Sequence, residues 1–130
     1  MNYYRILIVD NEIDLSKILK ISLVNAGYKV DIAYSAQEAL MKDLSIYNLL
    51  LLDISIGEMS GFKLTKIIRN DPKTSLIPII FLSANKSEND CLTAFATGAD
   101  DYITKPFSIL ELIARVSSVI RRVDSRKKTN

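Results

Sequence analysis

Three short runs of almost uninterrupted hydrophobic residues constrain the fold of this chain more than any other feature. They cover residues 6–9, 49–52 and 77–82, the last with Pro78 inside it. Strands of a parallel sheet that helices cover on both faces have this composition, whereas strands with one solvated face alternate between apolar and polar residues. The three runs therefore predict interior strands of a parallel sheet.

Two further segments predict the edges of that sheet. Residues 30–33 alternate in polarity, and Tyr102 and Ile103 form a short apolar pair flanked by charged residues. Segments whose hydrophobic residues recur at helical spacing lie between the strands, for example residues 15–26 and 112–123. Such a (βα)5 succession folds as an α/β, doubly wound, five-stranded parallel sheet. The edge assignments favour the flavodoxin-like strand order 2-1-3-4-5.

The length and the charge distribution indicate one domain with a different C-terminal end. With 130 residues, 48% of them hydrophobic, the chain suits a single compact domain, which we expect over residues 1–123. Residues 124–130 are expected to form a basic tail or the start of a linker. Residues 1–120 hold 12 basic and 14 acidic side chains, so the body offers little positive surface for nucleic acid. We expect no direct nucleic-acid binding by this domain.

Several residue types that carry chemistry are scarce or absent. Cys91 is the only cysteine, which excludes an internal disulfide and a cluster of thiolate metal ligands. Histidine is absent, so any phosphohistidine donor must lie on another protein. No apolar stretch approaches the roughly 20 residues of a membrane span, and no signal-peptide pattern opens the chain. We therefore expect a cytoplasmic protein without membrane contact.

Polar residues converge at one edge of the predicted sheet. Asp10, Asp53 and Ser83 each follow an interior run, and Lys105 follows the last edge strand. The carboxyl edge of an open α/β sheet, at the switch in strand order, is where ligands bind. Carboxyl and amide oxygens there suit Mg²⁺, and Asp53 is a candidate nucleophile. When a carboxylate attacks phosphorus, negative charge accumulates around the phosphoryl oxygens. A metal ion, the ammonium of Lys105 and the hydroxyl of Ser83 would stabilise that charge.

Five separated blocks resemble the receiver domains of two-component response regulators, nearest to the OmpR/PhoB type. The blocks are ILIVDNE at 6–12, LLLLDISIGEMSGF at 49–62, PIIFLSA at 78–84, GADDYITKPF at 98–107 and ELIARVSSVIRR at 111–122. The resemblance implies that Asp53 accepts a phosphoryl group from a sensor histidine kinase, assisted by Lys105. It implies that Ser83 and Tyr102 form the switch, and that the Lys105–Pro106 peptide bond is cis. The domain would assist only its own phosphotransfer and dephosphorylation.

By the same resemblance Mg²⁺ is held by Asp10, Asn11, Asp53 and the backbone carbonyl of Ser55. Asn11 departs from the family pattern, since a neutral amide stands where a second acid is usual. An asparagine oxygen still coordinates, so we expect weakened Mg²⁺ binding, and an unchanged affinity in Asn11→Asp would refute that expectation. Glu12 is a candidate for partial compensation.

Charged residues of the last predicted helix have two readings. Glu111, Arg115 and Arg122 lie opposite its apolar stripe, which by default is a solvated face with i, i+4 pairs. In the OmpR/PhoB type, the resemblance instead implies that Asp101 and this stripe join helix 4, strand 5 and helix 5 into a homodimer face. This surface would control an output, for example transcription through a DNA-binding domain beyond the C-terminus.

Three other functions compete with the receiver interpretation. An aspartate-nucleophile phosphatase wants a second Asp two residues after the nucleophile, where this chain has Ser55. A nucleotide or flavin binder wants a glycine-rich phosphate loop, and none follows any predicted strand. A receiver-like interaction module that works without phosphorylation is the runner-up, and Asn11 is the main argument for it.

Overall fold

The structure, a computed structural model, describes residues 4–57, 59–84 and 88–128, with the backbone alone for 88–90 and 126–128. Within these residues strands and helices alternate. The strands are β1 (Arg5–Val9), β2 (Lys29–Ala33), β3 (Leu49–Asp53), β4 (Ile79–Ser83) and β5 (Asp101–Thr104). The helices are α1 (Ile13–Asn25), α2 (Ala36–Leu40), the short 3₁₀ helix η1 (Leu44–Ile46), α3 (Gly61–Asn70), α4 (Glu88–Thr97) and α5 (Ile109–Lys128).

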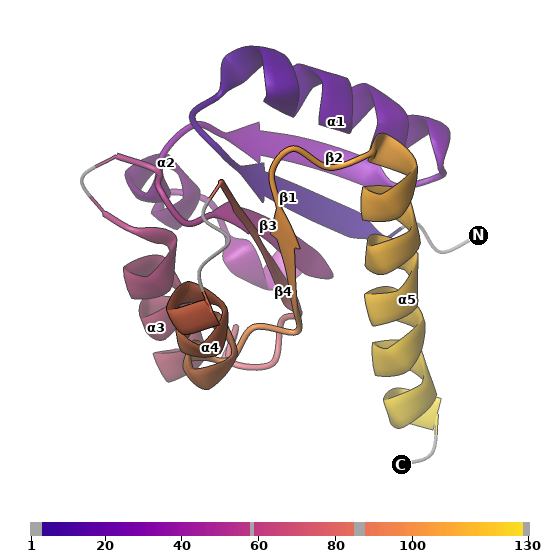
Figure 1. The fold of residues 1–130 in the computed structure, drawn as a ribbon. Helices are drawn as coiled ribbons and strands as arrows, with labels where there is room; N and C mark the ends of the chain where they lie inside the picture. The colour runs from indigo at the N-terminus through magenta and orange to yellow at the C-terminus, as the bar shows by residue number, and fades with distance from the viewer. Residues whose placement is uncertain (1–3, 58, 85–87, 129–130) are drawn as a thin grey trace.

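The strands form one parallel sheet in the order β2-β1-β3-β4-β5, which confirms the predicted topology (Figure 1). The predicted start of the fourth strand at Ile77 was wrong, because β4 begins at Ile79. Pro78 has no N–H to donate to a neighbouring strand. Its carbonyl still accepts a hydrogen bond from the Leu50 amide at 2.9 Å, so the pairing with β3 starts just before β4.

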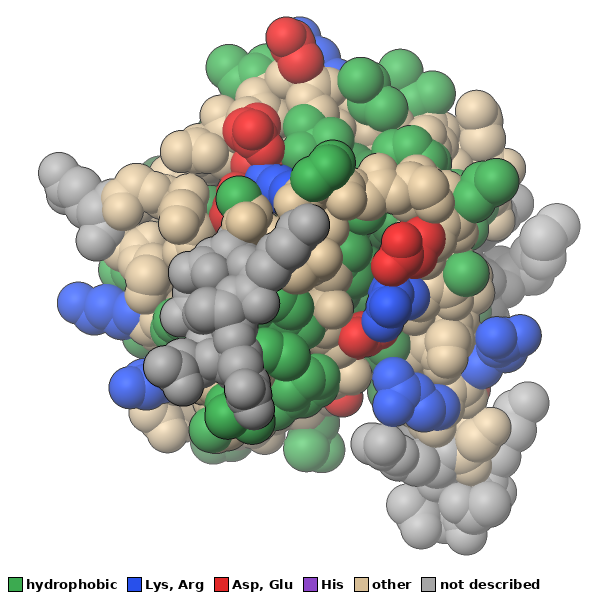
Figure 2. All heavy atoms as spheres, in the orientation of Figure 1, with side chains coloured by type: hydrophobic (Ala, Val, Ile, Leu, Met, Phe, Trp, Pro, Cys, Tyr) green, Lys and Arg blue, Asp and Glu red, His purple; other side chains and the backbone are tan. Residues whose placement is uncertain are grey.

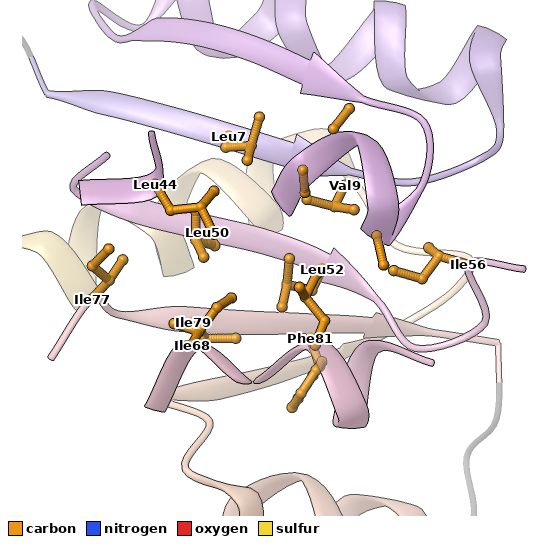
Figure 3. Close-up of a cluster of buried hydrophobic side chains, with 14 of the residues drawn as sticks. Leu7, Val9, Leu44, Leu50, Leu52, Ile56, Ile68, Ile77, Ile79 and Phe81 are labelled. Carbon is orange, nitrogen blue, oxygen red and sulfur yellow. The ribbon is translucent and has the colours of Figure 1, made fainter. Parts of the chain in front are cut away.

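Helices cover both faces of the sheet, with α1 and α5 on one side and α2, α3 and α4 on the other (Figure 1). Each interior strand alternates its side chains between the two layers. Leu7, Leu50 and Phe81 belong to the core beneath α2 and α3, as Figure 3 shows. Ile8 and Leu51 belong to the core beneath α1 and α5. Burial on both faces is the physical reason for the uninterrupted apolar runs.

Serine side chains begin several of the helices. Ser35 Oγ accepts a hydrogen bond from the Glu38 amide at 3.0 Å, and Ser108 Oγ accepts one from the Glu111 amide at 3.0 Å. These contacts satisfy amides that have no partner inside the helix. The first helix differs, because Glu12 stands at its N-cap position and makes no side-chain cap. The Glu12 carboxylate is therefore available for other contacts.

Two side-chain hydrogen bonds connect α5 to the residues that directly precede β1 and β2. Tyr28 Oη and Ser117 Oγ lie 2.8 Å apart, and Tyr4 donates a hydrogen bond to Asp124. The helix continues to Lys128, past the expected domain end at residue 123. The boundary between residues 123 and 124 stays a prediction.

No helix in the described part of the chain is both long enough and apolar enough to cross a membrane.

Candidate functional site

The polar residues predicted to converge do lie together at the carboxyl edge of the sheet. Asp10 follows β1, Asp53 ends β3 and Ser83 ends β4. Lys105 follows β5, and its backbone amide donates to the carbonyl of Ser83 at 2.7 Å. The Lys105–Pro106 peptide bond is cis, as the resemblance implied.

The Lys105 ammonium is the centre of the site. Its Nζ lies 3.0 Å from Asp10 Oδ2, 2.9 Å from Asp53 Oδ2 and 2.6 Å from Glu12 Oε2. Burial of the side chain by itself would lower the pKa of Lys105, but the hydrogen bonds that its ammonium donates to Glu12, Asp53 and Asp10 raise the pKa above the ordinary value. Lys105 is therefore held as an ammonium ion that faces three carboxylates.

Asp10 is the most enclosed carboxylate of the cluster, with no exposed surface. Its Oδ1 accepts a hydrogen bond from the Glu12 backbone amide at 2.9 Å, and Lys105 donates to its Oδ2. Burial raises the pKa of Asp10, and the nearby charge of Asp53 adds to the rise. The two hydrogen bonds oppose the rise without cancelling it. The ionised form of Asp10 is thus destabilised by its surroundings, which would favour a cation beside it.

Asp53 is held from both sides and remains 7% exposed. Its Oδ1 accepts from the Ser55 amide at 3.0 Å, and its Oδ2 accepts from Lys105. Gly61, the first residue of α3, packs against the end of β3, where a Cβ would lie 2.7 Å from the Asp53 carbonyl oxygen. A residue without a side chain lets α3 pass this close to Asp53. The motif around residue 61 contained this glycine, but sequence reasoning gave it no role.

The chemistry of these oxygens fits a hard divalent cation. One carboxylate oxygen each of Asp10, Glu12 and Asp53 lies within 4.8 Å of the others. Mg²⁺ prefers such oxygen ligands and keeps several waters. Of the two other predicted ligands, Asn11 is exposed and its side chain has no hydrogen-bond partner among the described residues. Ser55 is also exposed and contributes the amide that contacts Asp53.

The two predicted switch residues lie on neighbouring strands. Ser83 is 5% exposed and is paired in register with Thr104 of β5. Tyr102 is half-buried, is paired in register with Phe81 and packs against the core beneath α2 and α3. Because β4 and β5 are paired directly, a displacement of Ser83 at the end of β4 would affect the neighbouring strand that carries Tyr102.

Three of the four predicted interface residues form an ion-pair cluster on β5 and α5. Arg115 Nη1 lies 3.0 and 3.1 Å from the two carboxylate oxygens of Asp101, and Arg115 Nε lies 3.2 Å from Glu111 Oε1. Arg122 is exposed. Figure 2 shows acidic and basic side chains side by side over the upper part of the α5 region and basic side chains below them. Leu110 at the start of α5 is 80% exposed.

Residues 6–117 match the family model described as the response regulator receiver domain. The chain belongs to this family. It is thus a receiver domain of the response regulators of two-component systems, as its sequence indicated. The response regulator ArlR of Staphylococcus haemolyticus is 41% identical over 118 residues, which are 90% of this chain and 52% of that protein. ArlR of Staphylococcus aureus is 39% identical over 119 residues, or 91% and 53%. The chain spans about half the length of these curated relatives.

Solved structures of other receivers share the fold. A putative response regulator from Chloroflexus aurantiacus superimposes with a TM-score of 0.85 at 33% identity, covering 92% of this chain and 99% of that one. A two-component response regulator from Clostridium difficile gives 0.85 at 35%, covering 92% and 98%. A CheY-like receiver domain from Methanospirillum hungatei gives 0.87 at 28%, covering 99% and 100%. The CheY-like topology of the receiver is therefore shown over nearly the whole chain.

Proposed function

We propose that Asp53 accepts a phosphoryl group from a phosphohistidine on a sensor histidine kinase. The observation that carries this proposal is the Asp53 carboxylate, which lies 2.9 Å from the Lys105 ammonium at the carboxyl edge of the sheet. A carboxylate oxygen of Asp53 attacks phosphorus, and the P–N bond to the donor imidazole breaks. The electron pair leaves on the imidazole nitrogen, which takes up a proton. The receiver assists its own phosphotransfer and the later hydrolysis and has no other substrate.

The neighbours of Asp53 have separate roles in this proposal. Lys105 pairs with a phosphoryl oxygen after transfer, because its ammonium already reaches the carboxylate that becomes phosphorylated. Mg²⁺, held by Asp10, Asp53, Asn11 and the Ser55 carbonyl, would supply charge neutralisation for the phosphoryl oxygens. Asp10 would provide an oxygen ligand for that ion, because the Glu12 backbone amide and the Lys105 ammonium fix its position.

The switch follows from the added charge. The Ser83 hydroxyl, at the end of the strand beside β3, moves toward the new phosphoryl oxygens, and Tyr102 turns into the space that it leaves. Each 1.4 kcal/mol of preference of the phosphoryl group for the active state changes the ratio of states about tenfold. A few charge-assisted hydrogen bonds are therefore sufficient.

The surface of α4, β5 and α5 carries the output in this proposal. A second copy of the chain would exchange partners with the Asp101, Glu111 and Arg115 cluster and with Arg122, beside exposed Leu110. Contacts of this kind are self-complementary about a two-fold axis. Sedimentation of the domain with the phosphoryl mimic beryllofluoride should show a dimer. A monomer at high concentration would contradict this part of the proposal.

The ArlR relatives are about twice as long as this chain, which supports an output domain beyond α5. We propose that this output domain binds DNA and controls transcription in the cytoplasm.

The test is phosphorylation by a small donor. We would incubate the domain with acetyl phosphate and Mg²⁺ and weigh the intact protein, with Asp53→Asn as the matched control. The wild-type chain should gain the mass of one phosphoryl group, and Asp53→Asn should gain none. Equal gain in both chains would place the phosphoryl group elsewhere and contradict the assignment of Asp53.

Asn11 favours one alternative, a receiver that binds its partners without phosphorylation. In that case the wild-type chain gains no mass even at high Mg²⁺. The wild-type chain and the Asp53→Asn variant then dimerise, or bind the partner, equally well. A gain of mass that Asn11→Asp accelerates would instead show that the neutral residue tunes a working phosphoacceptor.

A further inference from the structure

Glu12 differs from the other two carboxylates that hold Lys105. Its contact with the ammonium, at 2.6 Å, is the shortest of the three. Its side chain is nevertheless 56% exposed, whereas that of Asp10 is fully buried and that of Asp53 is 10% exposed. Water can solvate Glu12 when it leaves the ammonium, so its departure costs far less than the departure of a buried carboxylate.

The charges of the cluster do not balance. Asp10, Glu12 and Asp53 carry three negative charges, and Lys105 carries one positive charge. One oxygen of each carboxylate lies within 4.8 Å of the others, which suits a divalent cation. The same three carboxylates already surround the ammonium, and two cations in one cluster repel each other. A divalent cation and Lys105 therefore compete for these oxygens, and Asn11 brings no charge that could settle the competition.

We infer that Glu12 is shared between the two cations. It holds the Lys105 ammonium while the site contains no divalent ion. When such an ion binds beside Asp10 and Asp53, Glu12 turns to it as the third carboxylate and releases Lys105 for the phosphoryl group. Glu12 is thus a positioning residue for Lys105 and supplies the charge that Asn11 lacks. This inference rests on the proposed function, because it assigns the cation site to phosphotransfer at Asp53.

The first test is the affinity for Mg²⁺, measured by isothermal titration on the unphosphorylated domain. Glu12→Gln should weaken binding at least about fivefold, which corresponds to about 1 kcal/mol. In the Asn11→Asp background, Glu12→Gln should lower the Mg²⁺ affinity less than about twofold, because the carboxylate introduced at position 11 then supplies the missing charge. Asp14→Asn, which removes one exposed charge from the first turn of α1, is the matched control and should stay within about twofold of wild type.

The second test removes the competitor. In the Lys105→Met background, Glu12 has no ammonium to leave when Mg²⁺ binds. Glu12→Gln should therefore lower the Mg²⁺ affinity by about tenfold or more in that background, which is a larger loss than in the wild-type background. Far-UV circular dichroism of every variant establishes that the fold is retained. Equal losses in the two backgrounds would overturn the sharing of Glu12 between the cations.

The remaining outcomes separate this inference from the proposed function. If Glu12→Gln binds Mg²⁺ as wild type does, or if Asp14→Asn loses as much, the inference is overturned. Phosphorylation of wild type by acetyl phosphate would then still support Asp53 as the acceptor. If the wild-type domain binds no Mg²⁺ and gains no phosphoryl mass, the inference and the proposed function fail together.

Discussion

Two partly buried clusters of charged side chains lie at the two ends of β4, and their charge balance differs. At its carboxyl end, three carboxylates face the single ammonium of Lys105. At its amino end, the guanidinium of Arg69 donates to backbone carbonyls and faces one carboxylate, that of Asp100, at 3.5 Å. The carbonyls are those of Ser75, Ile77 and Gly98, at 3.1, 2.6 and 2.7 Å. Asp100 in turn accepts from the Ile79 amide at 2.9 Å.

The difference separates stability from function. The Arg69 cluster has one positive and one negative charge, and the guanidinium and carboxylate donate or accept several hydrogen bonds that join α3 to the starts of β4 and β5. The Lys105 cluster has three carboxylates and one ammonium, and no other basic side chain among the described residues pairs with them. The first cluster stabilises the fold, and the second is the site that we propose for a cation and a phosphoryl group.

Loss of Arg69 should have the largest effect on stability. Burial lowers the pKa of Arg69, and the pairing with Asp100 opposes that effect. Arg69→Met would leave three carbonyls without this donor and Asp100 without its charge partner, at a cost of about 3 kcal/mol. Urea unfolding measures the loss. Lys66→Met, on an exposed position of the same helix, should stay within about 0.5 kcal/mol of wild type.

Substitution of Gly61 should affect both stability and the site. Ala is normally the better helix former, by about 1 kcal/mol. Here its Cβ would meet the Asp53 carbonyl oxygen at 2.7 Å, so we expect Gly61→Ala to destabilise the domain by about 2 kcal/mol. Phosphorylation by acetyl phosphate should also slow, because the end of β3 shifts. A gain in stability would contradict the close packing of α3 on Asp53.

Tyr47 gives a smaller effect that depends on pH. Burial, together with the hydrogen bond that Tyr47 donates to Asp31 Oδ2 at 2.7 Å, raises the pKa of Tyr47 above its ordinary value of 10.0. Because the ionised phenol is then favoured in the unfolded chain, stability is complete below that value and falls as the pH rises above it. Tyr47→Phe should lose about 1 kcal/mol at neutral pH and show a shallower fall above about pH 10. Urea unfolding across that range would reveal parallel curves if Tyr47 plays no part.

Much of the fold could be predicted from the sequence, because strands that are buried on both faces of a sheet consist almost entirely of hydrophobic residues. The interior strands followed from the apolar runs and the strand order from the edge assignments, and the strand ends brought Asp10, Asp53 and Lys105 to one edge of the sheet. The start of β4 was misplaced because hydrophobicity does not report which amides can pair. The Arg69 cluster was not foreseen, since its acceptors are mostly backbone carbonyls, which every residue has.

Glu12 marks the limit of sequence reasoning at the site itself. The sequence suggested Glu12 only as partial compensation for Asn11 at the metal site, and no pattern in it predicts a contact between the Glu12 carboxylate and Lys105. Only the structure places its carboxylate on Lys105 at 2.6 Å.

The most direct test of the contrast between the two clusters is the free energy of unfolding of wild type and Asp10→Asn, with and without Mg²⁺. Burial raises the folded pKa of Asp10, so its contribution to stability is greatest in acid and is lost as the pH rises through that pKa. Without Mg²⁺ at neutral pH, Asp10→Asn should therefore be the more stable chain. Mg²⁺ should stabilise wild type and stabilise Asp10→Asn much less. The account would be contradicted if Asp10→Asn were less stable without Mg²⁺ and both chains responded equally to the ion.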